Sequence, residues 1–251
     1  MRGFTILAGR PLANTTASSG NGAEYLQTPD PKEVWQAGAA GAVSINIDLG
    51  QAMAIDSLFL GFTNAVAGTT WEAFRTASIG GSNPVQILSS RPFALQDSYE
   101  PRVHGLALLD QPVTTRYLRV SLSQPVGAGP LVCGGLLVGK RFESPYEWKS
   151  GRRPIDLSER VDLAGGGFGF GPGAIKSAFG CTAADLDDAD VTTLYRLTKQ
   201  VGNRSPIVMV EGGTGEIAHD QLHYGVFERF EAYERENPDD TRWSLSMVEW
   251  A

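Results

Sequence analysis

Two histidines stand four residues apart in His219-Asp-Gln-Leu-His223, with Glu216 just before them. On a helix this spacing would place both imidazoles on one face, where they could share a zinc ion. The segment instead lies between a glycine-rich stretch and an expected strand, and it lacks the glutamate that follows the first histidine in zinc proteases. We therefore predict polar loop residues here and no metal site.

The aspartates at positions 185, 187, 188 and 190 are a second group whose chemistry fits cation binding. An EF-type calcium loop would need an oxygen ligand at Ala189 and a glycine at its turn, and neither is present. Aspartates in the first turn of a helix accept hydrogen bonds from free backbone amides and oppose the helix dipole. We therefore predict the start of a helix over about 187–201, with Val191, Leu194 and Val201 on its apolar face and Gly202 at its end.

No group of side chains predicts catalysis. The chain has three histidines and no G-x-S-x-G segment, and the glycine tract Gly165–Gly173 matches neither phosphate-binding fingerprint. Cys133 and Cys181 lie among apolar or small residues without a metal-binding or redox spacing, which predicts two buried free thiols. We expect no enzyme, no cofactor and no metal ion.

The elements that hold these residues are mostly short runs in which apolar and polar residues alternate. Ile45-Asn-Ile-Asp-Leu-Gly50 and Thr115-Arg-Tyr-Leu-Arg-Val120 each predict a strand with one buried face. The pattern predicts an all-β fold, with an N-terminal jelly-roll β-sandwich and a small C-terminal β-sandwich that carries the one helix. The expected strands are 44–48, 57–61, 73–79, 103–108, 116–122, 131–138, 155–163, 206–211, 222–233 and 242–250, with a hairpin turn at 237–240.

A change in composition near Gly139 predicts two domains among the 251 residues. Residues 1–139 form the first, residues 140–154 a linker or exchanged arm, and residues 155–251 the second. The net charge is -7, with 8 Lys/Arg against 9 Asp/Glu in residues 1–139 and 13 against 19 in the rest. This acidity disfavours nucleic-acid binding through phosphates. The first apolar stretch is too short for a signal peptide and none approaches a membrane span, so we expect cytoplasmic synthesis and no membrane insertion.

The first half resembles discoidin-like (F5/8 type C, galactose-binding-like) domains. The resemblance lies in Asn14-Thr-Thr-Ala-Ser-Ser19, Trp35, Asp48-Leu49-Gly50 and the Arg116-Tyr-Leu-Arg119 strand. In that family the loops at one end of the sandwich hold a ligand, often a sugar stacked on an aromatic ring. The aromatic and basic residues near the expected loops are Trp71, Arg75, Arg91, Tyr99, Arg102 and His104. They would form either a glycan site or a docking face for a neighbouring protein.

The order of elements in the last hundred residues resembles the tube-type domain of long-tailed bacteriophages, which has strands, one helix, and then an Ile-Val-Met-Val strand and a closing Trp-x-Leu-x-Met strand. Together the two halves are similar to distal tail or baseplate proteins of siphophages and gene transfer agents. That resemblance implies a structural protein at the virion tail tip, made in the host bacterial cytoplasm. It would form a ring, six-fold as the first expectation and three-fold as the alternative.

The same resemblance implies the partners of such a ring. They are sister subunits, the tail-tube protein and the tip-hub protein, with DNA passing through the channel without specific binding. The candidate subunit contacts are Phe142, Tyr146 and Trp148 in the expected arm, and Phe168 and Phe170 in the glycine tract. The alternative is a carbohydrate-binding protein that acts through the N-terminal domain.

Overall fold

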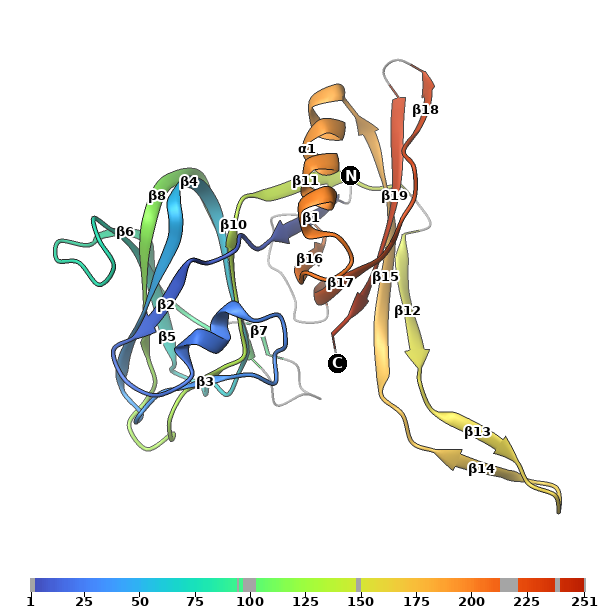
Figure 1. The fold of residues 1–251 in the computed structure, drawn as a ribbon, viewed down its shortest axis with the longest axis horizontal. Helices are drawn as coiled ribbons and strands as arrows, with labels where there is room; N and C mark the ends of the chain where they lie inside the picture. The colour runs from blue at the N-terminus through green and yellow to red at the C-terminus, as the bar shows by residue number, and fades with distance from the viewer. Residues whose placement is uncertain are drawn as a thin grey trace.

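The computed structural model describes residues 3–93, 95–96, 103–147, 150–212, 221–237 and 240–250. These residues form antiparallel sheets and one α-helix, which confirms the all-β prediction (Figure 1). The two large sheets form two units. The seven-stranded sheet folds into a sandwich, and the eight-stranded sheet curls beside it. In the described part of the chain, no helix is both long and apolar enough to cross a membrane.

The sandwich is built around two long strands, β4 (Ala42–Thr63) and β8 (Val103–Ser123), which pair with each other over most of their length. The strand order of its seven-stranded sheet is β10-β4-β8-β5-β6, with β2 paired to β4 and β7 paired to β8. The smaller elements are β2 (Asn14–Ala17), the 3-10 helix η1 (Ala23–Gln27), β3 (Trp35–Gln36), β5 (Thr70–Thr76), β6 (Val85–Pro92), β7 (Leu95–Gln96), β9 (Val132–Cys133) and β10 (Gly135–Gly139).

The two alternating runs singled out in the sequence pair with each other at the centre of this sheet. Ile47 lies opposite Leu118, and both are fully buried. On the exposed face, the Arg116 guanidinium forms two bonds to the Asp48 carboxylate, at 2.8 and 3.0 Å. Gly50 has a φ of 80° and donates its N–H to Asp48 where β4 turns a corner, so this position favours glycine. Trp35, wholly buried, completes the core.

The second unit is an eight-stranded sheet that curls around its own core, here called the curled sheet. Its order is β11-β1-β16-β17-β19-β15-β12, with β18 paired to β19. A bridge between Tyr146 and Ala183 links the continuation of β11 to β15, near the other end of this order. The strands are β1 (Gly3–Ala8), β11 (Arg141–Pro145), β12 (Gly151–Asp156), β15 (Ile175–Leu186), β16 (Ile207–Glu211), β17 (Leu222–Phe230), β18 (Glu234–Asn237) and β19 (Asp240–Glu249).

The expected boundaries at residues 1 and 139 differ from the sheets that form. The first strand, β1, lies between β11 and β16 in the curled sheet, so the sandwich is inserted between β1 and β11. The segment 140–154, expected as a linker or exchanged arm, supplies β11 and the start of β12 to the same sheet of the same chain. Backbone pairing between segments more than a hundred residues apart leaves no local pattern, so the place of β1 in the curled sheet could not be predicted from the sequence.

Helix α1 (Asp188–Val201) confirms the predicted helix. The Asp187 carboxylate caps it by accepting the Asp190 N–H at 2.7 Å, and Gly202 ends it. Val191, Leu194 and Val201 are buried in the same core as β15 and β19. Asp187 therefore has the capping role that the sequence predicted, and Asp188 and Asp190 lie in the first turn, whereas Asp185 lies in β15.

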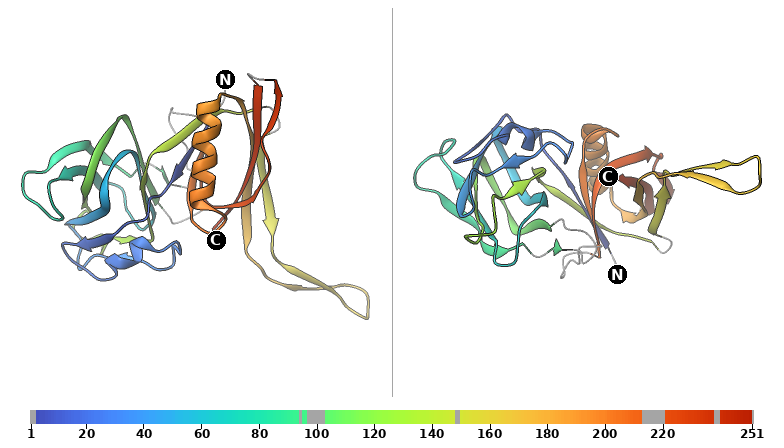
Figure 2. Two further views of the ribbon diagram at one scale, coloured as in Figure 1. Left: turned by 45° about the horizontal axis from the view of Figure 1, so that its top comes forward. Right: turned by 90° about the horizontal axis from the view of Figure 1, so that it is seen from below.

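A two-stranded ribbon leaves the curled sheet between β12 and β15. It consists of β13 (Glu159–Asp162) and β14 (Phe168–Gly171), and we call residues 157–175 the arm. Gly166 and Gly167, with φ values of 72° and 128°, turn the chain at its tip. Figures 1 and 2 show the arm projecting away from both units.

The sandwich and the curled sheet share an apolar junction. Phe59 and Leu137 from the sandwich pack with Val208 and Tyr224 from the curled sheet. The Tyr224 hydroxyl also donates to the carbonyl of Pro29 at 2.9 Å. Because β1 and β11 tie the sandwich to the curled sheet at both ends, this contact fixes the orientation of one unit on the other.

Candidate functional site

The arm carries the largest group of exposed apolar side chains in the described part of the chain. Phe170 is 70 % exposed and Phe168 is 53 % exposed. The two rings lie 6.3 Å apart, and the Arg160 guanidinium covers Phe168 at 4.4 Å. The other exposed apolar residues of the arm are Leu157, Val161, Leu163 and Ile175. An isolated two-stranded ribbon is at best marginally stable in water, and large exposed apolar patches mark interaction sites. The arm therefore has the composition of a contact surface.

The other candidate contact residues have a different environment. Phe142 is only 4 % exposed and packs against Phe4, with ring centroids 6.3 Å apart. Tyr146 stacks on the same Phe4 ring at 6.4 Å and is partly buried. Phe142 is therefore a core residue of its own chain and not a subunit contact, whereas the contact predicted for the partly exposed Tyr146 stays a prediction. Trp148 lies outside the described residues.

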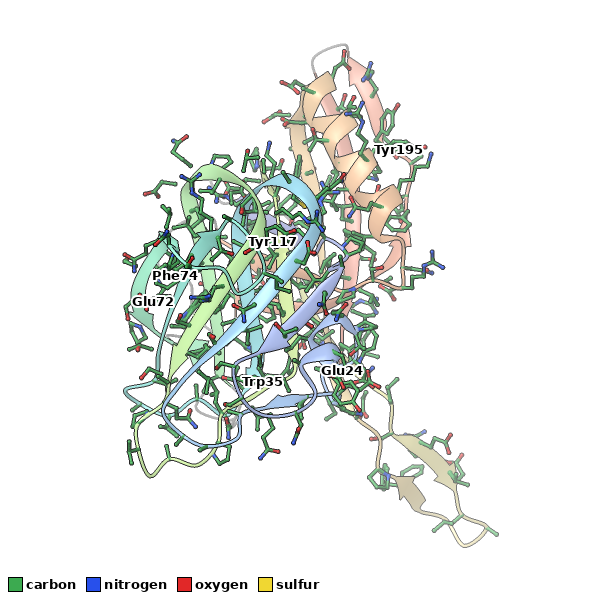
Figure 3. All side chains as sticks on the ribbon, turned by 60° about the vertical axis from the view of Figure 1, so that its left-hand side comes forward. Glu24, Trp35, Glu72, Phe74, Tyr117 and Tyr195 are labelled. Atoms are coloured by element: carbon green, nitrogen blue, oxygen red, sulfur yellow. The ribbon has the colours of Figure 1, made fainter. Side chains whose placement is uncertain are left out.

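A groove of about 670 Å³ opens along the side of the sandwich, and we call it the lateral groove. It runs between β6, the last strand in its sheet, and the bend of β8 at residues 108–114. In the part of the chain that the structure describes, the two arginines that line it, Arg75 and Arg91, have no ion pair or hydrogen bond through their side chains. Figure 3 shows β5, with Glu72 and Phe74 labelled, on this side of the sandwich, away from the curled sheet.

Of the six loop residues proposed for ligand contact, four are described, and of these only Arg75 and Arg91 line the lateral groove. Trp71 is 1 % exposed and belongs to the sandwich core. His104 is buried, and its Nδ1 accepts the backbone N–H of Phe62 at 3.0 Å. Tyr99 and Arg102 lie outside the described residues. No aromatic platform for a sugar therefore forms from Trp71 or His104.

His223 lies in β17, within the strand expected over 222–233, and this corrects the interpretation of the two histidines as polar loop residues at this position. Its side chain is 4 % exposed, and its ring stacks on Phe179 with centroids 5.5 Å apart. Nε2 contacts the Glu211 carboxylate at 2.6 Å, and Nδ1 contacts the Glu249 carboxylate at 2.7 Å. Arg152 also pairs with Glu211, at 2.6 Å. The cluster ties four strands together, β12, β16, β17 and β19.

The side chains of this cluster shift one another's pKa values in the direction that favours their charged forms. Burial alone would lower the pKa of His223, but its bonds to Glu211 and Glu249 outweigh burial and leave that pKa raised. Burial would raise the pKa of both glutamates, but the bonds from His223, and from Arg152 to Glu211, leave these pKa values lowered. The arrangement, an imidazole between two carboxylates, favours the protonated form of His223. The metal-ligating groups of the described residues form no cluster that could hold a metal ion, and His219 and Glu216 lie outside those residues.

The two thiols are buried, as predicted, and free of disulfides. Burial raises the pKa of Cys133 to about 11 and that of Cys181 to about 12. Both remain protonated at neutral pH, which makes them poor nucleophiles and poor metal ligands.

Sequence reasoning missed the lateral groove and the His223 cluster. The cluster had one local signal, because Leu222-His-Tyr-Gly-Val226 places a histidine within an otherwise apolar strand pattern. Its partners Glu211 and Glu249 end strands that are distant in the chain. The lateral groove has no local signal, since its two walls meet only when the sheet folds over.

Comparison with known proteins gives a fold-level likeness for one half of the chain. No family model matches, and no curated protein matches in sequence. One similar solved structure is the family 32 carbohydrate-binding module of NanJ from Clostridium perfringens, in complex with galactose. It is 17% identical to this chain, and the alignment covers 54% of this chain and 98% of that module at a TM-score of 0.41. Chitosan-binding module 1 from a Paenibacillus chitosanase/glucanase is 17% identical, with 52% and 97% covered and a TM-score of 0.42. A structure of reduced XRCC1 bound to the DNA polymerase beta catalytic domain is 19% identical, with 54% and 98% covered and a TM-score of 0.42.

Proposed function

We propose that this protein is a structural component of a bacteriophage tail, a distal-tail or baseplate ring protein at the tail tip. In this proposal the curled sheet and its arm join subunits into the ring, and the sandwich is displayed on the outside. The observation that carries it is the arm, a ribbon of exposed apolar side chains held away from its own chain. No step of this role requires catalysis, and we propose none.

The arm has the composition of an interface core. Fully burying one Phe, Leu, Ile or Val side chain is worth about 1.5–3 kcal/mol. Six such side chains are 52–70 % exposed on the arm, so burying what remains of them against a neighbour would be comparable with the cost of association, about 4–15 kcal/mol. Aromatic side chains are also enriched at the centres of protein interfaces, which fits Phe168 and Phe170.

The occupant that we propose is a second copy of the chain. The arm extends from one end of the curled sheet, whereas Tyr195 on α1 lies at the opposite end (Figure 3). In this proposal the arm of one copy contacts a different surface of the next copy, so the contact is heterologous, and such contacts close into rings when the rotation permits. Six-fold closure is the first expectation and three-fold the alternative. The tail-tube and tip-hub proteins would bind the ring faces, and DNA would pass without specific binding past the acidic C-terminal half.

The assembly proposal is tested by changing Phe168→Ser and Phe170→Ser together. Light scattering coupled to size exclusion, with negative-stain imaging, should show rings of the unaltered protein and folded monomers of the variant. The control is Val66→Ser with Val126→Ser, which removes two exposed apolar side chains from the sandwich and should leave the rings unchanged. An unaltered protein that stays monomeric at high concentration would refute self-assembly. Rings that survive in the Phe168→Ser, Phe170→Ser variant would refute the role of the arm as the subunit contact.

A second candidate is that the sandwich binds carbohydrate, and the lateral groove favours it. The groove is within the size range of small-molecule sites and is lined by both polar and apolar side chains. Two of the solved structures to which this half is similar are carbohydrate-binding modules. Glycan-array binding by the full-length protein would support this function, which is compatible with display on a ring. An array without binders would refute it.

A further inference from the structure

The lateral groove lies between two strand edges. Both odd and even residues of β6, from Val85 to Ser89, line one wall, and residues 108–114 of β8 line the other. β6 pairs only with β5, so its outer edge carries backbone N–H and C=O groups without a strand partner in the described chain. Opposite it, a register shift between Ile55 and Ser57 on β4 leaves β8 bulged. The walls therefore offer backbone hydrogen-bonding groups to an elongated ligand.

The charges in this groove differ from those of the whole molecule. The chain has a net charge of -7, yet the groove is lined by Arg75, Arg91 and a single acidic residue, Asp110. Six other arginines that the structure describes are paired with acidic groups, for example Arg116 with Asp48. Arg75 and Arg91 have no such partner within the described residues. A guanidinium is suited to bidentate bonds with a carboxylate, so two unpaired guanidiniums in one groove favour an anionic ligand.

The rest of the lining limits what that ligand can be. Leu88 and Val113, which pack in or against the sandwich core, are among the apolar lining residues of the groove, and Ser89, Gln111 and Thr114 add hydroxyl and amide groups suited to sugar hydroxyls. No residue that lines the described groove is aromatic, so a neutral pyranose has no ring to stack on. Affinity would have to come from charge-assisted bonds.

We propose that the lateral groove binds a carboxylate-bearing saccharide, with Arg75 and Arg91 as the residues that contact its acidic groups. This inference depends on the proposed carbohydrate-binding function of the sandwich, and it adds the class of sugar and the two residues that select it. The site lies along the edge of β6, on the flank of the sandwich. A nonspecific polyanion is disfavoured, because it would meet the net negative charge of the remaining surface.

The test uses the full-length protein and three carboxylated probes, namely oligogalacturonate, sialyllactose and a hyaluronate oligosaccharide. Each is paired with a neutral counterpart: methyl-esterified oligogalacturonate, lactose and N-acetylchitooligosaccharide. Calorimetric titration should give at least one carboxylated probe an affinity about tenfold or more above its counterpart, since a bond to a charged group contributes about 1.5–3 kcal/mol. The preference should decline as salt is added.

The variant is Arg75→Gln with Arg91→Gln, and the control is Arg196→Gln with Arg204→Gln, which removes two exposed charges elsewhere. The groove variant should lose about tenfold or more in affinity for the acidic probe, and the control should bind as the unaltered protein does. Equal binding of acidic and neutral probes would overturn the acidic preference and leave carbohydrate binding intact. Binding of none of the six probes would overturn the inference, and an empty glycan array would also overturn the function beneath it. Equal, arginine-dependent binding of poly-glutamate would identify a peptide site instead.

Discussion

The change His223→Leu should destabilise the curled sheet, because it removes the imidazole that lies between Glu211 and Glu249. Leucine fills much of the same space on Phe179 but donates no hydrogen bond to Glu211 or Glu249. Removing one partner of a buried ion pair costs about 3–5 kcal/mol, because the charge that remains is buried without compensation. Glu249 keeps a side-chain exposure of 30 % and Arg152 still pairs with Glu211, so we expect the lower end, about 3 kcal/mol. This loss is a large part of the free energy of unfolding of an ordinary domain.

The direction of the pH dependence follows from the pKa shifts. The pKa of His223 is raised from 6.5, so its contribution is complete below pH 6.5 and is lost as the pH rises through the folded pKa. The pKa values of Glu211 and Glu249 are lowered from 4.5, so their contribution is complete above pH 4.5 and is lost as the pH falls through the folded pKa values. The difference between unaltered protein and variant should therefore be greatest between pH 4.5 and 6.5.

Urea denaturation across this pH range, followed by circular dichroism, measures the difference. The control is Arg152→Gln, which removes a partner of the same Glu211 from a side chain that is 39 % exposed and should cost about 0–1 kcal/mol. A loss below about 1 kcal/mol for His223→Leu would place the cluster among exposed ion pairs and refute the reasoning. A difference that does not change with pH would refute the raised pKa of His223 and the lowered pKa values of the two glutamates.

Three further predictions concern packing, capping and thiol chemistry. Trp35→Ala should lower the free energy of unfolding by about 3–5 kcal/mol, because it leaves a cavity in the sandwich core. An unchanged urea midpoint would contradict the buried position of Trp35. Asp187→Ala should cost about 1 kcal/mol through the lost bond to the Asp190 N–H, and a stability equal to that of the unaltered protein would rule out the cap. Cys133 and Cys181 should react with a maleimide at pH 8 only after unfolding, since burial raises their pKa values to about 11 and about 12. Rapid labelling of the folded protein would contradict the burial of the two thiols.

Several features of the fold could be predicted from local patterns. The alternation in Ile45–Gly50 and Thr115–Val120 indicated half-buried strands, and these segments pair in the structure. The aspartates before Val191 and the glycine at position 202 indicated both ends of the helix. Such features depend on residues a few positions apart, for which side-chain periodicity and capping chemistry are sufficient evidence.

The sequence by itself determined an all-β chain with one capped helix and two buried thiols. Only the tertiary structure decided that β1 belongs to the curled sheet, that Phe142 is a core residue, that His223 lies between two carboxylates, and that Arg75 and Arg91 share a groove. The physical reason is that strand pairing and ion pairing join residues far apart in the chain. Alternation fixes which face of a strand is apolar, but it does not identify the strand that lies beside it.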